Sequence, residues 1–172
     1  PKTNLFADTK ITVGPDGMLA SSFDGPYRLG LRTTGASSVS GSFGGVTPLK
    51  GLTCSYGPIA LNDKLIVDGD IVFSSPIFLG SDLYVEMLDA SKDCFFTSMD
   101  GEHNLVIKFS DEAAFINNGY INFHSEIGGA FPLKSVNFAH NNGVTSFAIN
   151  AETINIQSEG SIVVVGDLTT NL

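Results

Sequence analysis

The sequence predicts an all-β protein whose short strands wind into a right-handed parallel β-helix of about eight coils. Three observations favour this fold: apolar and polar residues alternate in short runs, turn signals separate the runs, and a long motif occurs twice. The 172 residues are expected to form a single β-solenoid segment of two related units, about 1–88 and 89–172. A β-sandwich, which would show the same alternation, is the alternative.

The alternating runs are clearest in the second half of the chain. "NLVIKFS" places Leu105, Ile107 and Phe109 on one face of an extended chain, and "TINIQ" does the same with Ile154 and Ile156. A period of two residues is expected of strands that bury one face. These runs therefore predict strands whose apolar side chains point into a core.

Turn signals lie between the runs, and only one stretch would suit a helix. Asp-Gly and Asn-Gly pairs favour tight turns because both residues tolerate unusual backbone angles. The stretch that would suit a helix is "SDLYVEMLDASKD" at 81–93, for which alternating Leu83, Val85 and Met87 lead us to predict a strand. The six turn pairs occur at 16–17, 24–25, 68–69, 100–101, 118–119 and 142–143.

The duplicated motif contains a Gly-Gly pair, two spacer residues and Pro-Leu-Lys. It occurs in "SFGGVTPLKGL" (42–52) and in "SEIGGAFPLKSV" (125–136), with the Pro-Leu-Lys segments 84 residues apart. Upstream, "FDGPYRLGL" (23–31) parallels "MDGEHNLVI" (99–107) at an offset of 76 residues. A repeat of this length would divide into four turns of about 21 residues, which is the short end of repeat-protein periods.

Residues at repeated, alternating positions are expected to point into the core. Cys54 occupies the position that Phe138 occupies in the second copy, so we interpret it as a core residue and not as a nucleophile. No disulfide is expected between Cys54 and Cys94, because positions two turns apart lie about 10 Å apart and a disulfide needs about 7 Å or less between Cα atoms. The predicted core comprises Leu52, Cys54, Leu105, Ile107, Phe109, Leu133, Val136, Phe138, Ile154 and Ile156.

The order of these signals resembles that of the large β-strand-repeat proteins of bacterial surfaces, namely autotransporter passengers and filamentous-haemagglutinin-like exoproteins. In both halves "DG-x-x-x-L" precedes "GG-x-x-PLK", and strand pairs then close on "GSDL" (80–83) or "VGDL" (165–168). The resemblance covers most of the chain, but it rests on the order of turn and strand motifs and includes no catalytic or binding signature. It implies an exported, non-enzymatic β-helical protein of elongated or fibrous shape.

Paired carboxylates are the first candidates for chemistry, because pectin-lyase-like β-helices bind substrate and Ca²⁺ through acidic side chains. A lyase or glycosidase also needs a base or a second acid nearby. The nine Lys and Arg residues are spread thinly, so we expect the carboxylates to lie on a solvated face. The calcium nonapeptide repeat is excluded because the Gly-Gly motifs lack its Asp. The pairs are Asp68-Asp70, Asp82-Glu86 and Asp111-Glu112.

His103, His124 and His140 share no spacing that suggests a triad or a metal site, and we expect each to be an exposed strand or turn residue. No phosphate loop, Gly-x-Ser-x-Gly or His-Glu-x-x-His motif occurs either. The sequence therefore predicts no catalytic residues, no cofactor and no metal.

A formal net charge of −9 argues against a nucleic-acid partner, because such a surface repels phosphates. No apolar run approaches the roughly 20 residues of a membrane span, so none is expected in this segment. The opening residues show no signal-peptide core, so either export preceded this start or the segment was cut from a longer chain. We expect the protein outside the cell or on the bacterial surface.

The favoured hypothesis is a non-enzymatic structural or adhesive segment that presents exposed side chains to a receptor or glycan on a host or neighbouring cell. The alternatives are a polysaccharide-processing β-helix enzyme and a subunit of a self-assembling filament or surface layer. No capping pattern closes either end, and unpaired strand edges invite pairing. We therefore expect the coil around Ile162–Leu168 to continue into more of the same chain or to stack on another copy near Leu5–Val13.

Overall fold

The computed structural model describes residues 2–110 and 119–170, and within these residues it contains seventeen β-strands and no helix. Nearly every strand is short and pairs in parallel with the strands of the coils above and below it. The strands are β1 (Lys2–Asn4), β2 (Thr9–Val13), β3 (Leu19–Ala20), β4 (Ser22–Asp24), β5 (Arg28–Thr33), β6 (Ser37–Val39), β7 (Gly51–Tyr56), β8 (Ile59–Val67), β9 (Ile71–Ser74), β10 (Ile77–Met87), β11 (Cys94–Phe96), β12 (Met99–Asp100), β13 (Asn104–Phe109), β14 (Tyr120–Phe123), β15 (Leu133–Ser146), β16 (Ile149–Val164) and β17 (Leu168–Thr170).

The strands wind around a three-sided prism. Face A contains β2, β5, β7, β9, β11, β14 and the C-terminal ends of β15 and β16. Face B contains β3, β6, β12, β17 and the N-terminal ends of β8, β10 and β16. Face C contains β1, β4, β13 and the remaining parts of the long strands, which bend around an edge. The predicted parallel β-solenoid is confirmed, and the sandwich alternative is wrong.

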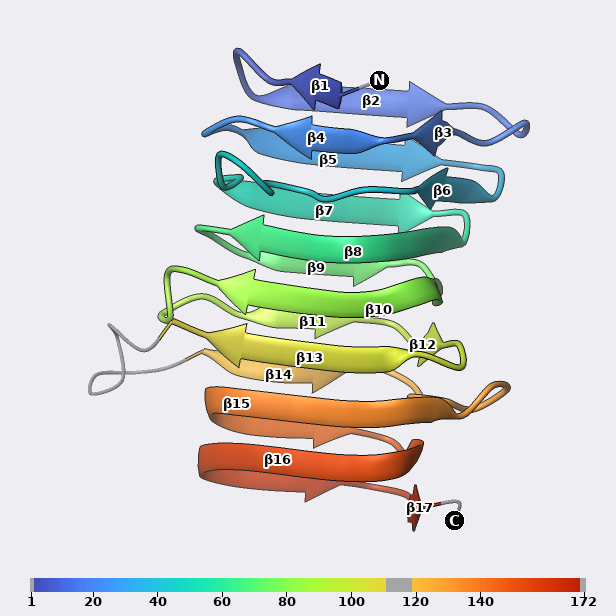
Figure 1. Cartoon of the computed structure of the whole chain (residues 1–172), viewed down its shortest axis with the longest axis vertical. Coiled ribbons are helices and arrows are strands. Elements are labelled where there is room, and N and C mark those ends of the chain that lie inside the picture. Colours follow the sequence, from blue (N-terminus) through green and yellow to red (C-terminus); the bar gives the residue numbers. More distant parts are fainter. Residues whose placement is uncertain (1, 111–118, 171–172) are drawn as a thin grey trace.

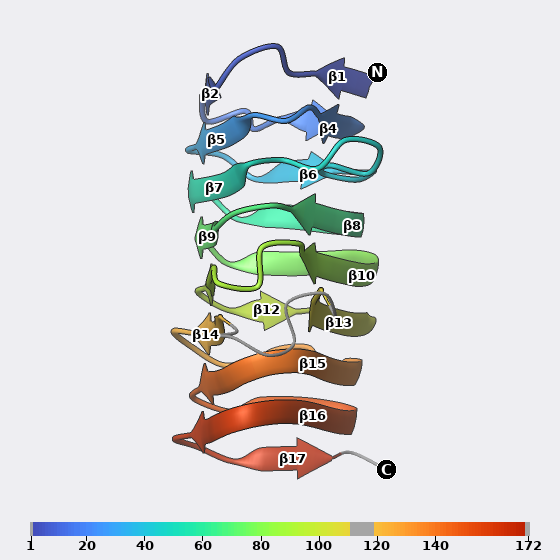
Figure 2. The same cartoon turned by 90° about the vertical axis from the view of Figure 1, so that its left-hand side faces the viewer.

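The coil is right-handed. In Figure 1 the chain descends from the N-terminus, and the strands nearest the viewer run leftward while those behind run rightward. Figure 2 places face A on the left and face C on the right of the same stack. The chain visits the faces in the order A, B, C, so each coil completes one turn of the prism.

The core consists of inward-facing side chains that stack from coil to coil. On face A the register aligns Leu52 with Ile71, and Ile71 with Cys94. The next inward position carries an aromatic column in which Phe96 lies 5.8 Å from Phe73 and 5.0 Å from Phe123 between ring centroids. Stacked columns of this kind bury each side chain against its equivalents above and below, which is why the parallel register is specified.

The predicted core residues face inward, but those of the last coil are less buried than the others. Eight of the ten predicted residues are buried, whereas Ile154 and Ile156 are only partly buried. Both lie in β16, which pairs on face C with β15 alone, so their inward side chains are covered on one side. Cys54 and Cys94 are free thiols two coils apart, as predicted. The stretch 81–93 forms the end of β10 and then turns, which confirms the strand.

The duplicated motif is a corner built from two successive coils. In the first copy Gly44 N–H donates to the Phe23 carbonyl at 2.7 Å, and in the second Gly128 N–H donates to the Met99 carbonyl at 2.7 Å. The conformations also agree, since φ is 70° at Gly44 and 69° at Gly128. The upstream "DG" segment and the downstream "GG" loop are therefore two halves of one unit.

The two copies occupy different edges of the prism, which corrects the expected division into four turns. Gly25 turns the chain from face C to face A, whereas Gly101 turns it from face B to face C. The copies are thus separated by three coils and two further faces. The inward positions of face A also recur at intervals that range from 18 to 27 residues, because the corners differ in length.

The last described coil is poorly covered. Ile162 is 47% exposed, Val165 is 69% exposed and Leu168 is 56% exposed. At the other end Leu5 is buried, although β2 pairs only with β5. That these edges meet another coil or another copy stays a prediction.

Candidate functional site

The carboxylates that the sequence singled out serve mainly to hold coils together. The Asp68 carboxylate forms an ion pair with Lys50, and Asp82 Oδ1 accepts the backbone N–H of Asn104 at 3.0 Å. Because those hydrogen bonds stabilise the ionised form, they hold the pKa of Asp82 below its usual value. Glu86 lies 4.0 Å from the Lys108 ammonium. Asp111 and Glu112 lie outside the described residues.

Several aspartates share this structural role at the edges of the prism. Each accepts a backbone N–H from the next coil, at a corner where the sheet ladder is interrupted and the donor would otherwise lack a partner. The acidity of the chain therefore has a local explanation in addition to solubility. The aspartates are Asp8, Asp24, Asp70, Asp82, Asp93 and Asp100.

The histidines are not brought together. His103 lies 3.7 Å from Asp82 at a corner, and His124 is exposed beside Phe95 on face A, with 6.3 Å between ring centroids. His140 belongs to β15, and its side chain is not described. Burial raises the pKa of the Cys54 and Cys94 thiols well above the usual value, so neither is a ready nucleophile.

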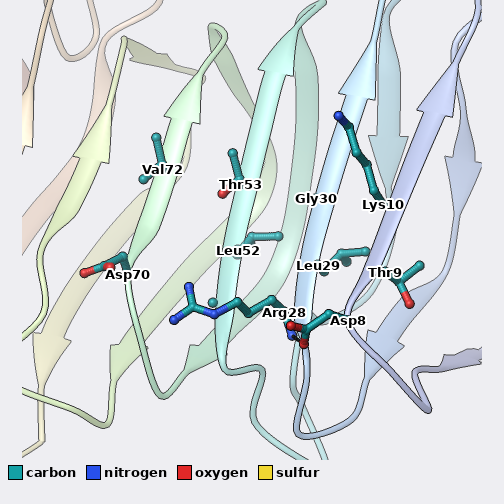
Figure 3. A pocket seen from close by; sticks show the side chains of 11 residues that line it. Asp8, Thr9, Lys10, Arg28, Leu29, Gly30, Leu52, Thr53, Asp70 and Val72 are labelled. Carbon is teal, nitrogen blue, oxygen red and sulfur yellow. Dashed lines mark hydrogen bonds between the residues drawn. The ribbon is translucent and has the colours of Figure 1, made fainter.

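Face A carries a shallow hollow, which we call the face A trough. Its volume is about 500 Å³, and it crosses β2, β5, β7 and β9 (Figure 3). Figure 3 shows the Arg28 side chain lying across β7 toward Asp70, with Lys10 on the opposite side. The outward side chains that line it are Asp8, Lys10, Arg28, Thr53, Asp70 and Val72.

Two glycines form the floor of the trough. A Cβ atom at Gly51 would lie 3.2 Å from Nη1 of Arg28, so the missing side chain leaves the room in which the guanidinium lies. A Cβ atom at Gly30 would meet nothing closer than Cγ of Lys10 at 3.7 Å. Glycine is unfavourable inside strands, and it often marks a place where another group approaches the backbone.

The hollow continues along face A toward the C-terminal coils. A second depression of about 370 Å³ shares Val72 with the trough and is lined by Ser74, Phe95, Thr97 and His124. A third, of about 460 Å³, lies between Ser74 and Ser55. Face A thus carries a row of three adjoining depressions, lined by hydroxyls, aromatic rings and both basic and acidic side chains.

A strained tyrosine forms part of the rim of face A. Tyr56 has φ of 84°, a conformation that a bulky residue rarely adopts, and its side chain is 62% exposed. The Arg32 guanidinium lies 4.3 Å from the centroid of its ring, a cation–π contact. Strained exposed residues concentrate at functional sites, which makes this rim part of the candidate site.

The basic residues of the trough are available to a ligand. Among residues 2–110 and 119–170, no carboxylate oxygen lies within 4.0 Å of the charged nitrogens of Lys10 or Arg28. By contrast, Lys2 and Lys50 are each paired with an aspartate. The trough therefore has two cationic side chains without an ion pair in the described structure, Lys10 and Arg28, beside two carboxylates, Asp8 and Asp70, that accept backbone N–H groups.

None of the lining basic residues was predicted from the sequence as a site. Lys10, Arg28 and Thr53 belong to three different coils, and they become neighbours only through the register of β2, β5 and β7. One available signal was that both arginines of the chain lie in the single strand "RLGLR" at 28–32.

The comparisons with known proteins identify no relative. No family model, no curated protein and no solved structure matches this chain. In the described part of the chain, His, Cys, Asp and Glu side chains form no group of three that could hold a metal ion. A search of the same residues for a helix long and apolar enough to cross a membrane finds none.

Proposed function

We propose that the chain is a non-enzymatic, structural and adhesive β-solenoid segment of an exported bacterial surface protein. Two observations support this proposal. The order of turn and strand motifs resembles that of autotransporter passengers and filamentous-haemagglutinin-like exoproteins, and the fold is one whose length grows by adding coils. The observation that carries the proposal is the face A depression, which extends across successive coils of a continuously packed rod.

A rod of this kind suits adhesion because its binding surface is rigid. The floor of the trough is part of the parallel sheet, so outward side chains keep fixed spacings of about 4.8 Å between coils. A preorganised surface loses little conformational entropy when it binds a ligand. The basic and hydroxyl side chains of face A are thus presented in a defined array.

The experiment is antibody labelling of intact source cells, combined with brief protease treatment of the cell exterior. We expect labelling at the surface and loss of the label after protease, while a cytoplasmic marker stays intact. Labelling that appears only after the cells are broken would overturn the proposal.

A second candidate function, a subunit of a self-assembling filament, is favoured by the exposed apolar residues of the last coil. Burying Ile162 and Leu168 under a further coil would remove apolar surface from water and pair the open strand edge. Sedimentation at increasing concentration tests this function. Association that Ile162→Lys abolishes supports assembly through this edge, and a monomer at all concentrations contradicts it.

A further inference from the structure

We infer that the face A trough binds a carboxylated polysaccharide, whose acidic sugars contact Arg28 and Lys10 and whose chain continues along the solenoid axis. The inference rests on the proposed adhesive function, because it names the class of ligand that the surface would hold. Three features of face A carry it: the shape of the depression, the groups that line it and the charge that they leave unpaired.

The shape fits a linear polymer. The trough shares Val72 with the next depression, so the two hollows adjoin and together extend from β2 to His124, just after β14, across the direction of the strands. A polymer along this direction meets an equivalent outward position on every coil, namely Lys10, Gly30, Thr53, Val72 and Phe95 in succession. Gly30, in the floor, lets such a chain approach the backbone of the first coils, whereas the Arg28 side chain lies over Gly51.

The lining groups match the chemistry of sugars. The hydroxyls of Thr53, Ser74 and Thr97 both donate and accept hydrogen bonds, as sugar hydroxyls require. Phe95 and His124 supply two aromatic rings farther along, with centroids 6.3 Å apart and planes tilted by 35°, against which the ring of a sugar can pack. This combination of scattered hydroxyls and a few rings is typical of surfaces that recognise polar, uncharged backbones.

The two basic side chains that lack an ion pair among the described residues favour a ligand that carries acidic groups. The Arg28 guanidinium lies between Asp8 and Asp70 without an ion pair in the described structure, and Asp8 uses Oδ1 to accept the Arg28 backbone N–H at 2.9 Å. An arginine fork binds a carboxylate through two parallel hydrogen bonds, which is its strongest common partnership. Lys10, on the adjacent coil, supplies a second cation for the next acidic group.

Other polymers fit this face less well. An extended peptide binds to a sheet through main-chain hydrogen bonds at an edge, whereas the backbone groups of face A are already paired with the coils above and below. Nucleic acid is bound through many phosphate contacts from Lys and Arg, whereas the trough offers two such side chains, Lys10 and Arg28. A ligand over the middle of face A meets side chains only, which favours a polysaccharide.

The test measures binding of short oligomannuronate by calorimetry, with oligomannose of the same linkage as the neutral control. The two probes differ only in the carboxylate. We expect oligomannuronate to bind and oligomannose to bind at least about tenfold more weakly, because a charged hydrogen-bonded pair is lost. Added salt should weaken the binding of the acidic probe.

Two variants locate the site. Arg28→Gln should weaken oligomannuronate binding about tenfold or more, while Lys134→Gln, an exposed lysine far along the rod, should leave it unchanged. Gly30→Val should fill the floor without strain, because φ is not positive there and its Cβ has room. Gly14→Val is the matched control, since its Cβ would lie in open space outside the trough.

Circular dichroism and urea unfolding should show that all four variants fold. Equal binding of both probes, absence of binding to oligomannuronate, or retained binding in Arg28→Gln and Gly30→Val would overturn the inference.

These outcomes are separable from the failure of the proposed function. A protein that labels at the cell surface and does not bind the acidic probe contradicts the ligand alone, whereas a protein confined inside the cell contradicts the adhesive function whatever it binds.

Discussion

The two copies of the duplicated corner differ less in structure than in sequence. In the first copy Asp24 Oδ1 accepts the backbone N–H groups of Val46 and Thr47 at 2.7 and 3.2 Å. In the second, Asp100 Oδ1 accepts those of Ala130 and Phe131 at 2.9 and 3.2 Å. The loop residues that the carboxylate holds have changed completely, yet the geometry has not.

This comparison shows which part of the motif is structural. The Asp-Gly pair and the first glycine of Gly-Gly set the backbone, and Gly25 and Gly101 have φ of 131° and 127°. The tip residues point outward and were free to diverge, since Val46 is 76% exposed and Phe131 is 49% exposed. The unit therefore forms the same corner on two different edges of the prism, with different side chains at its tip.

The first glycine of each Gly-Gly pair should be the most sensitive position. A Cβ at Gly44 would lie 2.2 Å from the Ile66 carbonyl oxygen, and at Gly128 it would lie 2.1 Å from that of Asn150. These are backbone atoms, and φ is positive at both sites. We expect Gly44→Ala and Gly128→Ala each to lower the free energy of unfolding by about 3 kcal/mol or more, measured by urea denaturation.

The second glycine of the second pair, Gly129, is the matched control for Gly128. A Cβ at Gly129 would meet the carboxylate end of Glu126 at 2.5 Å, which is the mobile tip of a side chain. Gly129→Ala should therefore cost about 1 kcal/mol or less. Equal losses at the first and second glycines would show that the positive φ is not what the motif requires.

The two capping aspartates should differ in their effect. The Asp24 side chain is 5% exposed and also forms an ion pair with Lys2 at 3.2 Å, whereas Asp100 is only partly buried. We expect Asp24→Ala to cost about 2–3 kcal/mol, because two backbone N–H groups and the Lys2 ammonium lose a buried, charged acceptor. Asp100→Ala should cost about 1 kcal/mol, since water can replace the carboxylate. Urea unfolding of the two variants side by side measures this, and the reverse order would contradict it.

The first corner should also respond to acid. Burial raises the pKa of Asp24, but the hydrogen bonds from Val46 and Thr47 and the contact with Lys2 outweigh it and leave the pKa below 3.8. A carboxyl whose pKa is lowered by folding contributes its full stability above the unfolded-state value. That contribution is lost as the pH falls through 3.8 toward the folded-state pKa.

Asp24→Asn removes this contribution while keeping the shape of the side chain. The difference in unfolding free energy between the wild type and Asp24→Asn should be largest near about pH 6 and should shrink toward about pH 3. A difference that is constant across this range would show that the charge of Asp24 does not stabilise the corner.

The fold class could be predicted because it depends on patterns that a single sequence displays. Alternation at Leu105, Ile107 and Phe109 reports which side chains face inward, and it does so without knowledge of neighbouring coils. The duplicated glycines likewise indicated where the corners lie. The partial exposure of Ile154 follows from its place in the last coil, which alternation cannot reveal.

The coil register and the trough could not be predicted in this way. Corners differ in length, so the interval between stacked positions varies, and the two copies are separated by three coils and two further faces instead of four whole turns. Without the register, nothing in the sequence places Lys10 beside Gly30 or Arg28 beside Gly51. The candidate site is a product of stacking between coils, and its residues carry no motif.

The smallest effects are expected at the loop tips, where the two copies present different side chains. Phe131 packs edge-on against Phe78, with ring centroids 5.9 Å apart, and Phe78 is itself 45% exposed. Phe131→Ala should lower the free energy of unfolding by about 1 kcal/mol, because an aromatic pair is lost. Val46→Ala should change it by about 0.5 kcal/mol or less, since 76% of that residue is already in water. Urea unfolding resolves the larger effect, and adding Phe78→Ala completes a double-mutant cycle in which the coupling should account for most of the loss. A loss of unfolding free energy at Val46 as large as that at Phe131 would mean that the tips also stabilise the corner. The two copies would then be less free to diverge than their sequences indicate.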